Sequence, residues 1–214
     1  MKENANKKII LDKVKVVIFD CDGVMFDSKQ ANIAFYNTIL KHFGKPDLRE
    51  KDVEIVHMST AEEAVDYLFR DDPRLPEAQK YRLQIDYQKF IDLMEMEPHL
   101  KEVLSSLHNR YYIALATNRT DSIYTILDRF KLHKYFDLIV SSLDVSNPKP
   151  HPETIFKILN HFSIDIHEAV YVGDSTVDCE LARKTNIFFI AYKRPQLKAG
   201  FHINDLRELL TILA

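Results

Sequence analysis

Five acidic residues stand at spacings that suit cation binding and attack on phosphorus. Asp20, Asp22 and Asp27 follow an apolar run in VVIFDCDGVMFDS, and Asp174 and Asp178 stand four apart in GDSTVD. Carboxylates that lie close together raise one another's pKa unless a cation or a lysine compensates. Mg²⁺ prefers oxygen ligands and leaves room for water and a phosphate. The acidic residues therefore predict a Mg²⁺ site.

Asp20 is a candidate covalent nucleophile, because an aspartate can attack phosphorus to form an aspartyl-phosphate. A metal is needed there, since a carboxylate and a phosphate dianion repel each other. The leaving alkoxide needs a proton, so a second carboxyl group must act as an acid and later as a base on water. Asp22 can take this second role if the chain turns sharply at Gly23.

The residues that position these side chains form an alternating pattern of strands and helices. Short apolar runs predict strands at 14–19, 111–117, 136–142, 169–174 and 187–192. Helical spacing of apolar residues predicts helices at 29–43, 99–109, 121–130, 152–162 and 178–185. This alternation predicts an α/β fold with a Rossmann-like, doubly wound parallel sheet. Ligands bind at the carboxyl ends of such strands, where Thr117, Asn118 and Lys149 would join the aspartates.

The segment between the first strand and Pro98 differs from the rest of the chain. From about Asp47 to Glu97 it consists of charged amphipathic helical segments, with no strand predicted among them. Its tyrosines and phenylalanines at 36, 67, 81, 87 and 90 fall at helical spacings and predict a small core. We therefore expect an α/β core domain of residues 1–28 and 98–214, and a helical cap domain of residues 29–97.

Composition excludes several kinds of partner. Lys plus Arg number 29 and Asp plus Glu 32, so there is no bulk charge that would favour nucleic acid or an anionic membrane. The basic start is followed by an apolar stretch too short for a signal peptide or a membrane span. Two cysteines, Cys21 and Cys179, are too few for a disulfide scaffold. These features predict a cytoplasmic protein with a small-molecule partner, and nothing in the pattern requires more than a monomer.

Four segments in order along the chain, DCDGVMFD, ATN, KP and GDSTVD, resemble the four motifs of the haloacid dehalogenase superfamily. The resemblance covers nearly the whole chain. The helical insertion resembles the cap of the phosphoglycolate phosphatase and β-phosphoglucomutase branch. The resemblance implies a Mg²⁺-dependent phosphomonoester phosphatase that acts on a small phosphorylated metabolite through an aspartyl-phosphate.

The resemblance also implies roles for single residues. Asp20 would be the nucleophile and a Mg²⁺ ligand, and Asp22 would be the acid/base and lend its backbone carbonyl to the metal. Asp174 would bind Mg²⁺, and Asp178 would do so directly or through a water molecule.

The remaining motif residues would act on the phosphoryl group or the backbone. Thr117 and Asn118 would hydrogen-bond the transferring phosphoryl group, and Lys149 would neutralise the nucleophile and the phosphate. Asp27 would be a structural residue of the turn rather than a ligand.

Other interpretations of these residues stay open. His57 and Ser59 are candidate substrate contacts in the cap, although a plain helix start at Ser59 or Thr60 explains them equally well. Ser175 is expected to be a helix N-cap rather than a nucleophile, because GxSxG requires a glycine where Val177 stands. A calcium loop around Asp20 would lack the glycine and glutamate that an EF-hand needs.

Two alternative functions compete with the phosphatase. Sugar phosphomutases of the branch place a histidine about a dozen residues after the nucleophile, where this chain has Asn32, which disfavours a mutase. A phosphate-ligand binding protein that has lost turnover is the third hypothesis. The substrate itself stays open between phosphoglycolate, a sugar phosphate, a nucleotide and pyrophosphate.

Overall fold

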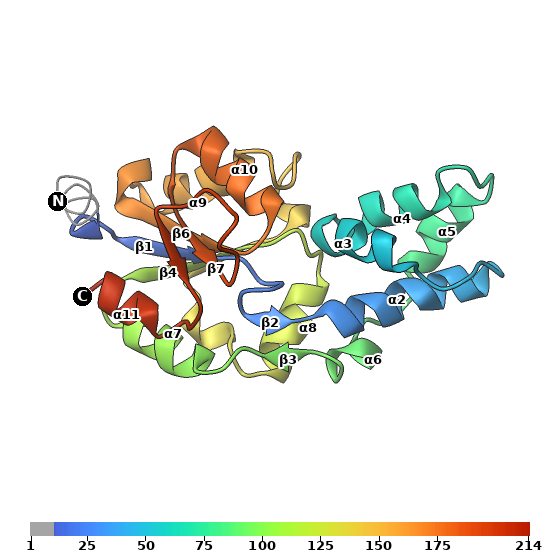
Figure 1. Ribbon diagram of the computed structural model, residues 1–214, viewed down its shortest axis with the longest axis horizontal. Helices are drawn as coiled ribbons and strands as arrows, with labels where there is room; N and C mark the ends of the chain where they lie inside the picture. Colours follow the sequence, from blue (N-terminus) through green and yellow to red (C-terminus); the bar gives the residue numbers. More distant parts are fainter. Residues whose placement is uncertain (1–10) are drawn as a thin grey trace.

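A six-stranded parallel sheet forms the centre of the computed structural model, which describes residues 11–214 (Figure 1). In spatial order the strands are β5 (Leu138–Val140), β4 (Tyr112–Ala116), β1 (Val16–Phe19), β6 (Ala169–Gly173), β7 (Phe188–Tyr192) and β8 (Phe201–Ile203). Every neighbouring pair is parallel. The chain runs outward from β1 to β5 and then returns to β6 on the other side of β1. Because the strand order reverses beside β1, the carboxyl end of β1 lies at the crevice where such sheets bind ligands.

Both faces of the sheet are covered. Val17 and Phe19 of β1 belong to one apolar cluster, whereas Val16 and Ile18 belong to the other, as expected when successive side chains point to opposite faces. All four are fully buried. This two-sided burial explains why β1 reads as a continuous apolar run rather than an alternating one.

The helices divide between these two clusters. Buried residues of α7 (Leu100–His108), α8 (Ser122–Arg129) and α11 (Glu208–Ile212) belong to the cluster of Val17 and Phe19. The buried apolar residues of α9 (Glu153–Phe162) and α10 (Thr176–Thr185) belong to the cluster of Val16 and Ile18. Three short 3-10 turns complete this part of the chain: η1 (His133–Tyr135), η2 (Ser142–Asp144) and η3 (Ile166–Glu168). The predicted doubly wound α/β fold is therefore confirmed.

The inserted segment is a group of helices beside the sheet (Figure 1). It contains α2 (Lys29–His42), α3 (Glu50–Met58), α4 (Ala61–Phe69), α5 (Leu75–Arg82) and α6 (Gln88–Ile91). Aromatic side chains pack inside it, with the ring of Phe35 5.5 Å from that of Tyr87 and the ring of Phe43 5.3 Å from that of Phe69. Within residues 11–214, no helix combines the length and the apolar character that crossing a membrane requires.

A two-stranded antiparallel ribbon joins the insertion to the sheet. β2 (Phe26–Asp27) pairs antiparallel with β3 (Glu95–Met96), so both chain crossings lie side by side. The prediction of no strand between Asp47 and Glu97 is therefore wrong. A two-residue strand has no readable pattern, and its partner lies about 70 positions away along the chain, so its pairing is set by tertiary structure.

Glu97 fixes the second crossing to the end of β7. The side chain is buried, and its Oε2 accepts hydrogen bonds from Tyr192 Oη at 2.8 Å and Lys193 Nζ at 2.7 Å. Its backbone N–H donates to Met25 O at 2.9 Å, which also ties it to the first crossing.

Candidate active site

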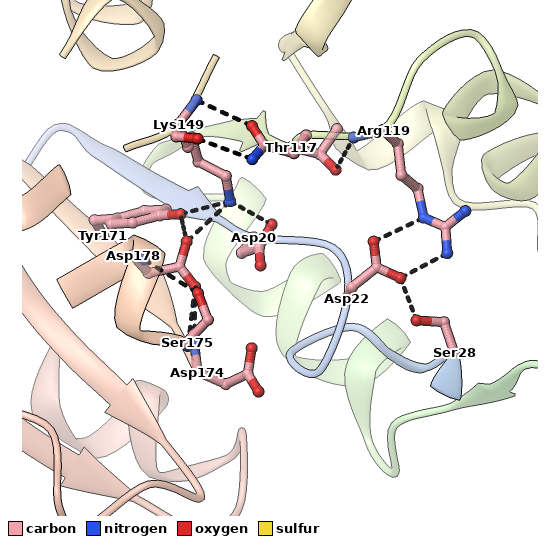
Figure 2. A network of polar contacts seen from close by, with 11 residues as sticks. Asp20, Asp22, Ser28, Thr117, Arg119, Lys149, Tyr171, Asp174, Ser175 and Asp178 are labelled. Carbon is pink, nitrogen blue, oxygen red and sulfur yellow. Dashed lines mark hydrogen bonds and ion pairs between the residues drawn. The ribbon is translucent and has the colours of Figure 1, made fainter. Parts of the chain in front are cut away.

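Charged and polar side chains from four segments meet at the carboxyl end of the sheet (Figure 2). Asp20 follows β1, Thr117 follows β4, Asp174 follows β6, and Lys149 comes from the loop between η2 and α9. Lys149 Nζ lies 2.7 Å from Asp20 Oδ1, although the two residues are 129 positions apart. The parallel strands thus bring the predicted residues together.

The turn after β1 has room only for glycine at position 23. Gly23 has a φ of +79°, in the left-handed region that costs other residues energy. A Cβ built on it would lie 2.3 Å from Asp174 Oδ2. The backbone at Gly23 therefore lies directly against the side chain of Asp174.

Lys149 is the central cation of the site. Its Nζ donates hydrogen bonds to Asp20 Oδ1 at 2.7 Å, Asp178 Oδ1 at 2.9 Å and Tyr171 Oη at 3.0 Å. Burial alone would lower the pKa of Lys149, but the carboxylates of Asp178 and Asp20 outweigh burial and raise it. The lysine therefore stays charged beside Asp20.

Asp178 has both carboxylate oxygens occupied. Oδ1 accepts hydrogen bonds from Lys149 and Tyr171, and Oδ2 accepts from Ser175 Oγ at 2.5 Å and Ser175 N at 3.1 Å. Burial would raise the pKa of Asp178, but Lys149 and these hydrogen bonds outweigh it and lower the pKa. Ser175 in turn caps α10 by accepting from Asp178 N at 3.1 Å, which confirms its expected N-cap role. These contacts make Asp178 the organiser of Lys149 and of the start of α10.

The acidic cluster suits a divalent cation. Asp20, Asp174 and Asp178 each offer a carboxylate oxygen, and these oxygens all lie within 4.8 Å of one another. Burial and the nearby Asp178 raise the pKa of Asp20 and raise that of Asp174 to about 7. Lys149 and Arg194 together balance two of the three negative charges. Oxygen ligands with excess negative charge are the donor set that Mg²⁺ takes.

Asp22 turns away from this cluster and pairs with Arg119 (Figure 2). Arg119 donates from Nε to Asp22 Oδ2 at 2.8 Å and from Nη2 to Asp22 Oδ1 at 2.6 Å, and Ser28 Oγ also donates to Asp22 Oδ1. Burial would raise the pKa of Asp22, but the Arg119 guanidinium outweighs it and lowers the pKa. The sequence prediction missed Arg119. Its signal was the charged residue that directly follows ATN at the end of a buried strand.

Thr117 and Asn118 lie at the end of β4, where they were expected. The side chain of Asn118, however, is hydrogen-bonded within the protein. Its amide exchanges two hydrogen bonds of 3.0 Å with the backbone of Lys149, whose bond to Pro150 is cis. Thr117 is buried, and its hydroxyl accepts a hydrogen bond from Arg119 N at 3.1 Å. Asn118 therefore positions Lys149, and contact of either residue with a phosphoryl group stays a prediction.

A cavity of about 330 Å³ connects these residues to the insertion. Its lining includes Asp20, Asp22, Lys149 and Asp174 from the sheet side and His57 and Ser59 from the insertion. Burial lowers the pKa of His57, and its Nδ1 lies 2.9 Å from Asn32 Nδ2. Ser59 Oγ donates to Ile55 O at 2.8 Å, and Thr60 is the residue that caps α4. Both predicted cap residues thus face the cavity, while the helix start belongs to Thr60.

Three further residues of the site were not predicted. Tyr171 bonds Lys149 and Asp178 from within β6, and Ser28 bonds Asp22. Arg194 donates from Nε to Asp174 O at 3.1 Å, and its Nη2 lies 3.4 Å from Asp174 Oδ2. Asp27 lies outside the cluster on β2, where its Oδ1 accepts from Lys29 N at 3.1 Å, in line with its expected structural role.

Comparison with known proteins gives consistent matches. The family model described as haloacid dehalogenase-like hydrolase matches residues 17–192. A pyrophosphatase of Bacillus pumilus is 31% identical, over 77% of this chain and 76% of its own. A phosphoglycolate phosphatase of Nitrosospira multiformis is 25% identical, over 84% of each chain. The crystal structure of a HAD-superfamily hydrolase, subfamily IA, variant 1, from Geobacter sulfurreducens is 39% identical, with a TM-score of 0.77 over 95% of this chain and 98% of that one.

Proposed function

Because this chain belongs to the haloacid dehalogenase-like hydrolase family, we propose that it is a Mg²⁺-dependent phosphatase that hydrolyses a small phosphorylated metabolite. The observation that carries the proposal is the contact of 2.7 Å between Asp20 and Lys149, beside Asp174 and at the wall of the cavity. The names of the relatives, a phosphoglycolate phosphatase and a pyrophosphatase, support a phosphoryl substrate.

Asp20 acts as the nucleophile in the proposed reaction. One of its carboxylate oxygens forms a bond to phosphorus while the bond from phosphorus to the ester oxygen breaks. Asp22 gives a proton to the leaving oxygen, which requires it to leave Arg119 and to be protonated first, because that pair keeps the carboxyl ionised. Water then attacks the aspartyl-phosphate, Asp22 takes a proton from that water, and the bond between phosphorus and Asp20 breaks to release phosphate.

The other residues of the site balance charge and fix the positions of the reacting groups. Lys149 neutralises Asp20 and the phosphoryl oxygens, and the Thr117 hydroxyl donates a hydrogen bond to one of those oxygens. Asp178 and Tyr171 keep the lysine in place through their hydrogen bonds to it. The helical segment 29–97 acts as a cap that closes over the substrate, with His57 and Ser59 facing it, and limits entry of water before the aspartyl-phosphate forms.

The metal would be held by Asp20, Asp174 and the backbone carbonyl of Asp22. Asp178 would act through a water molecule, because both of its oxygens are already hydrogen-bonded. When bound, Mg²⁺ reduces the repulsion between a carboxylate and a phosphate dianion. We expect the protein to act as a monomer in the cytoplasm.

The test is hydrolysis of p-nitrophenyl phosphate by the purified protein with Mg²⁺. Asp20→Asn should abolish turnover because the amide cannot form the acyl phosphate, and excess chelator should abolish it reversibly. Asp27→Asn serves as the matched control, since Asp27 is exposed and lies outside the cluster, and it should keep full activity. Turnover that survives both D20N and the chelator would refute the proposal.

The mutase alternative gains no support from the contacts of Asn32. Its side chain is hydrogen-bonded to His57 and to Tyr87 Oη at 2.8 Å, and an amide cannot carry the proton that a histidine would carry at this position. Isomerisation of a sugar phosphate that depends on a sugar bisphosphate would favour the mutase instead. Tight binding of phosphate esters without turnover would favour the binding protein.

A further inference from the structure

Arg119 is a buried cation with one acidic partner. It is 9% exposed, and among residues 11–214 its ion pair is with Asp22. The pair is bidentate, and its two hydrogen bonds of 2.6 and 2.8 Å occupy one whole edge of the guanidinium. A buried guanidinium is stable only when an anion or several acceptors compensate for its lost hydration.

The proposed role of Asp22 conflicts with this pair. To give a proton to the leaving oxygen, the Asp22 carboxyl must face the phosphoryl group on Asp20. Figure 2 shows it turned the other way, toward Arg119 and Ser28. When Asp22 turns inward, Arg119 is left buried without a counter-charge, which is costly. Another anion must then take the place of Asp22.

We propose that Arg119 binds a second anionic group of the substrate, a carboxylate or a phosphate, and that this group displaces Asp22 toward the reacting phosphoryl group. The inference rests on the proposed function and names its substrate class. A planar guanidinium binds carboxylates and phosphates with the same paired N–H groups that now hold Asp22. The substrate therefore needs two anionic ends.

The surroundings hold Arg119 ready at the cavity wall. Its guanidinium lies over the ring of Tyr87, 4.9 Å from the ring centroid, and its Nη2 lies 3.4 Å from Asn32 Oδ1. Tyr87 and Asn32 belong to the helical insertion, whereas Arg119 follows β4. These contacts keep the guanidinium in place while its carboxylate partner changes.

The other cations of the cavity fit this role less well. Lys149 is shared between Asp20 and Asp178, and Arg194 contacts Asp174. Arg82 lines the cavity from α5, where its Nε donates to Gln79 Oε1 at 2.8 Å. Arg82 contacts neither Asp22 nor the acidic cluster in this arrangement, so it offers a matched control with the same side chain in the same cavity.

The test compares substrates that differ in one charge. Phosphoglycolate and inorganic pyrophosphate carry a second anionic group, and ethyl phosphate does not. The wild type should hydrolyse at least one of the first two with a kcat/KM at least tenfold above that for ethyl phosphate. Which of the two it prefers distinguishes a carboxylate from a phosphate. In Arg119→Gln the preference should fall at least tenfold, and Arg119→Lys should retain part of it.

Arg82→Gln should keep the wild-type preference. An unchanged preference in Arg119→Gln, a preference lost in Arg82→Gln, or a wild type that hydrolyses all three compounds equally well would overturn the inference. If Arg119→Gln does not fold, as judged by thermal melting, Arg119→Lys decides, and an unaltered preference there overturns the inference.

Binding separates this inference from the proposed function. In a protein that carries Asp20→Asn, dissociation constants of the same three compounds can be measured by calorimetry without turnover. Tighter binding of a compound with two anionic ends, weakened at least tenfold by adding Arg119→Gln, supports the subsite even if the wild type hydrolyses none of them. Equal binding of all three compounds overturns it, whatever the activity.

Discussion

The surroundings of Asp174 destabilise its ionised form. It is 8% exposed and lies beside Asp178, and these two effects raise its pKa to about 7 even though Arg194 opposes them. In an unfolded chain the same carboxyl has a pKa near 3.8. Without a cation, the folded protein therefore binds a proton at Asp174 that the unfolded chain has already lost.

This difference predicts how stability changes with pH after metal removal. A carboxyl with a raised folded pKa stabilises the fold at low pH, and this contribution is lost as the pH rises from about 4 to about 7. A tenfold difference in proton affinity between the folded and unfolded chains corresponds to about 1.4 kcal/mol of unfolding free energy. In excess chelator, thermal melting at pH 8 should therefore occur at a lower temperature than at pH 5.

Mg²⁺ should restore the loss at pH 8, because the cation favours the ionised carboxylates. Asp174→Asn should reduce both the pH effect and the Mg²⁺ effect, and Asp27→Asn should change neither. If Mg²⁺ fails to raise the melting temperature at pH 8, Asp174 does not face a bound cation.

The turn that follows β1 is the element on which the site depends most. Gly23 combines a φ of +79° with contact to Asp174, whereas Gly44 after α2 has a φ of +67° and nothing within 4 Å of its would-be Cβ. The two glycines therefore separate backbone strain from crowding. Strain is common to both positions, and crowding occurs only at Gly23.

Alanine at these two positions gives a matched prediction. Gly44→Ala should cost about 1 kcal/mol of unfolding free energy from the left-handed backbone alone. Gly23→Ala should cost about 2 kcal/mol or more, since the neighbouring carboxylate must also move, and it should lower kcat/KM by at least tenfold. Urea unfolding and p-nitrophenyl phosphate hydrolysis measure the two effects. Equal losses in both variants would contradict the crowding.

Elements built from local signals were predictable from the sequence. β1 and β6 are short apolar runs buried on both faces, so composition alone located them. α2 ends at His42 and α10 ends at Thr185, within one residue of the helix ends predicted at 43 and 185. Motif order then located Asp20, Lys149 and Asp174 at one sheet edge.

Features that depend on distant partners were not predictable. The pairing of β2 with β3 and the bond between Asp22 and Arg119, 97 positions apart, exist only once the chain is folded. β8 and α11 were also missed, because three and five residues are too short for a periodic pattern. Hydrogen bonding by Asn118 is a similar case, since spacing does not show which groups a side chain reaches.

At the scale of the whole molecule, the sheet and the inserted helices line one cavity. Polar contacts across it include Met58 Sδ to Thr176 Oγ1 at 3.5 Å and Asn32 to Arg119 at 3.4 Å, and one apolar cluster continues from the sheet side into the inserted helices. The chain passes between the two parts twice, and these two crossings pair as the ribbon of β2 and β3, which Glu97 anchors. These two paired crossings are the axis about which we expect the cap proposed above to rotate.

Because both crossings run through that one ribbon, we expect the inserted helices to move together, so that a single rotation controls how a ligand enters and leaves. A motion of this kind works against solvent friction. Where release of the product limits the rate, we expect kcat to fall in proportion to added sucrose viscosity, and an equal weight of polyethylene glycol, which raises bulk but little local friction, should slow it far less. A kcat that does not change with sucrose would mean that the chemical step, rather than this rotation, limits the rate.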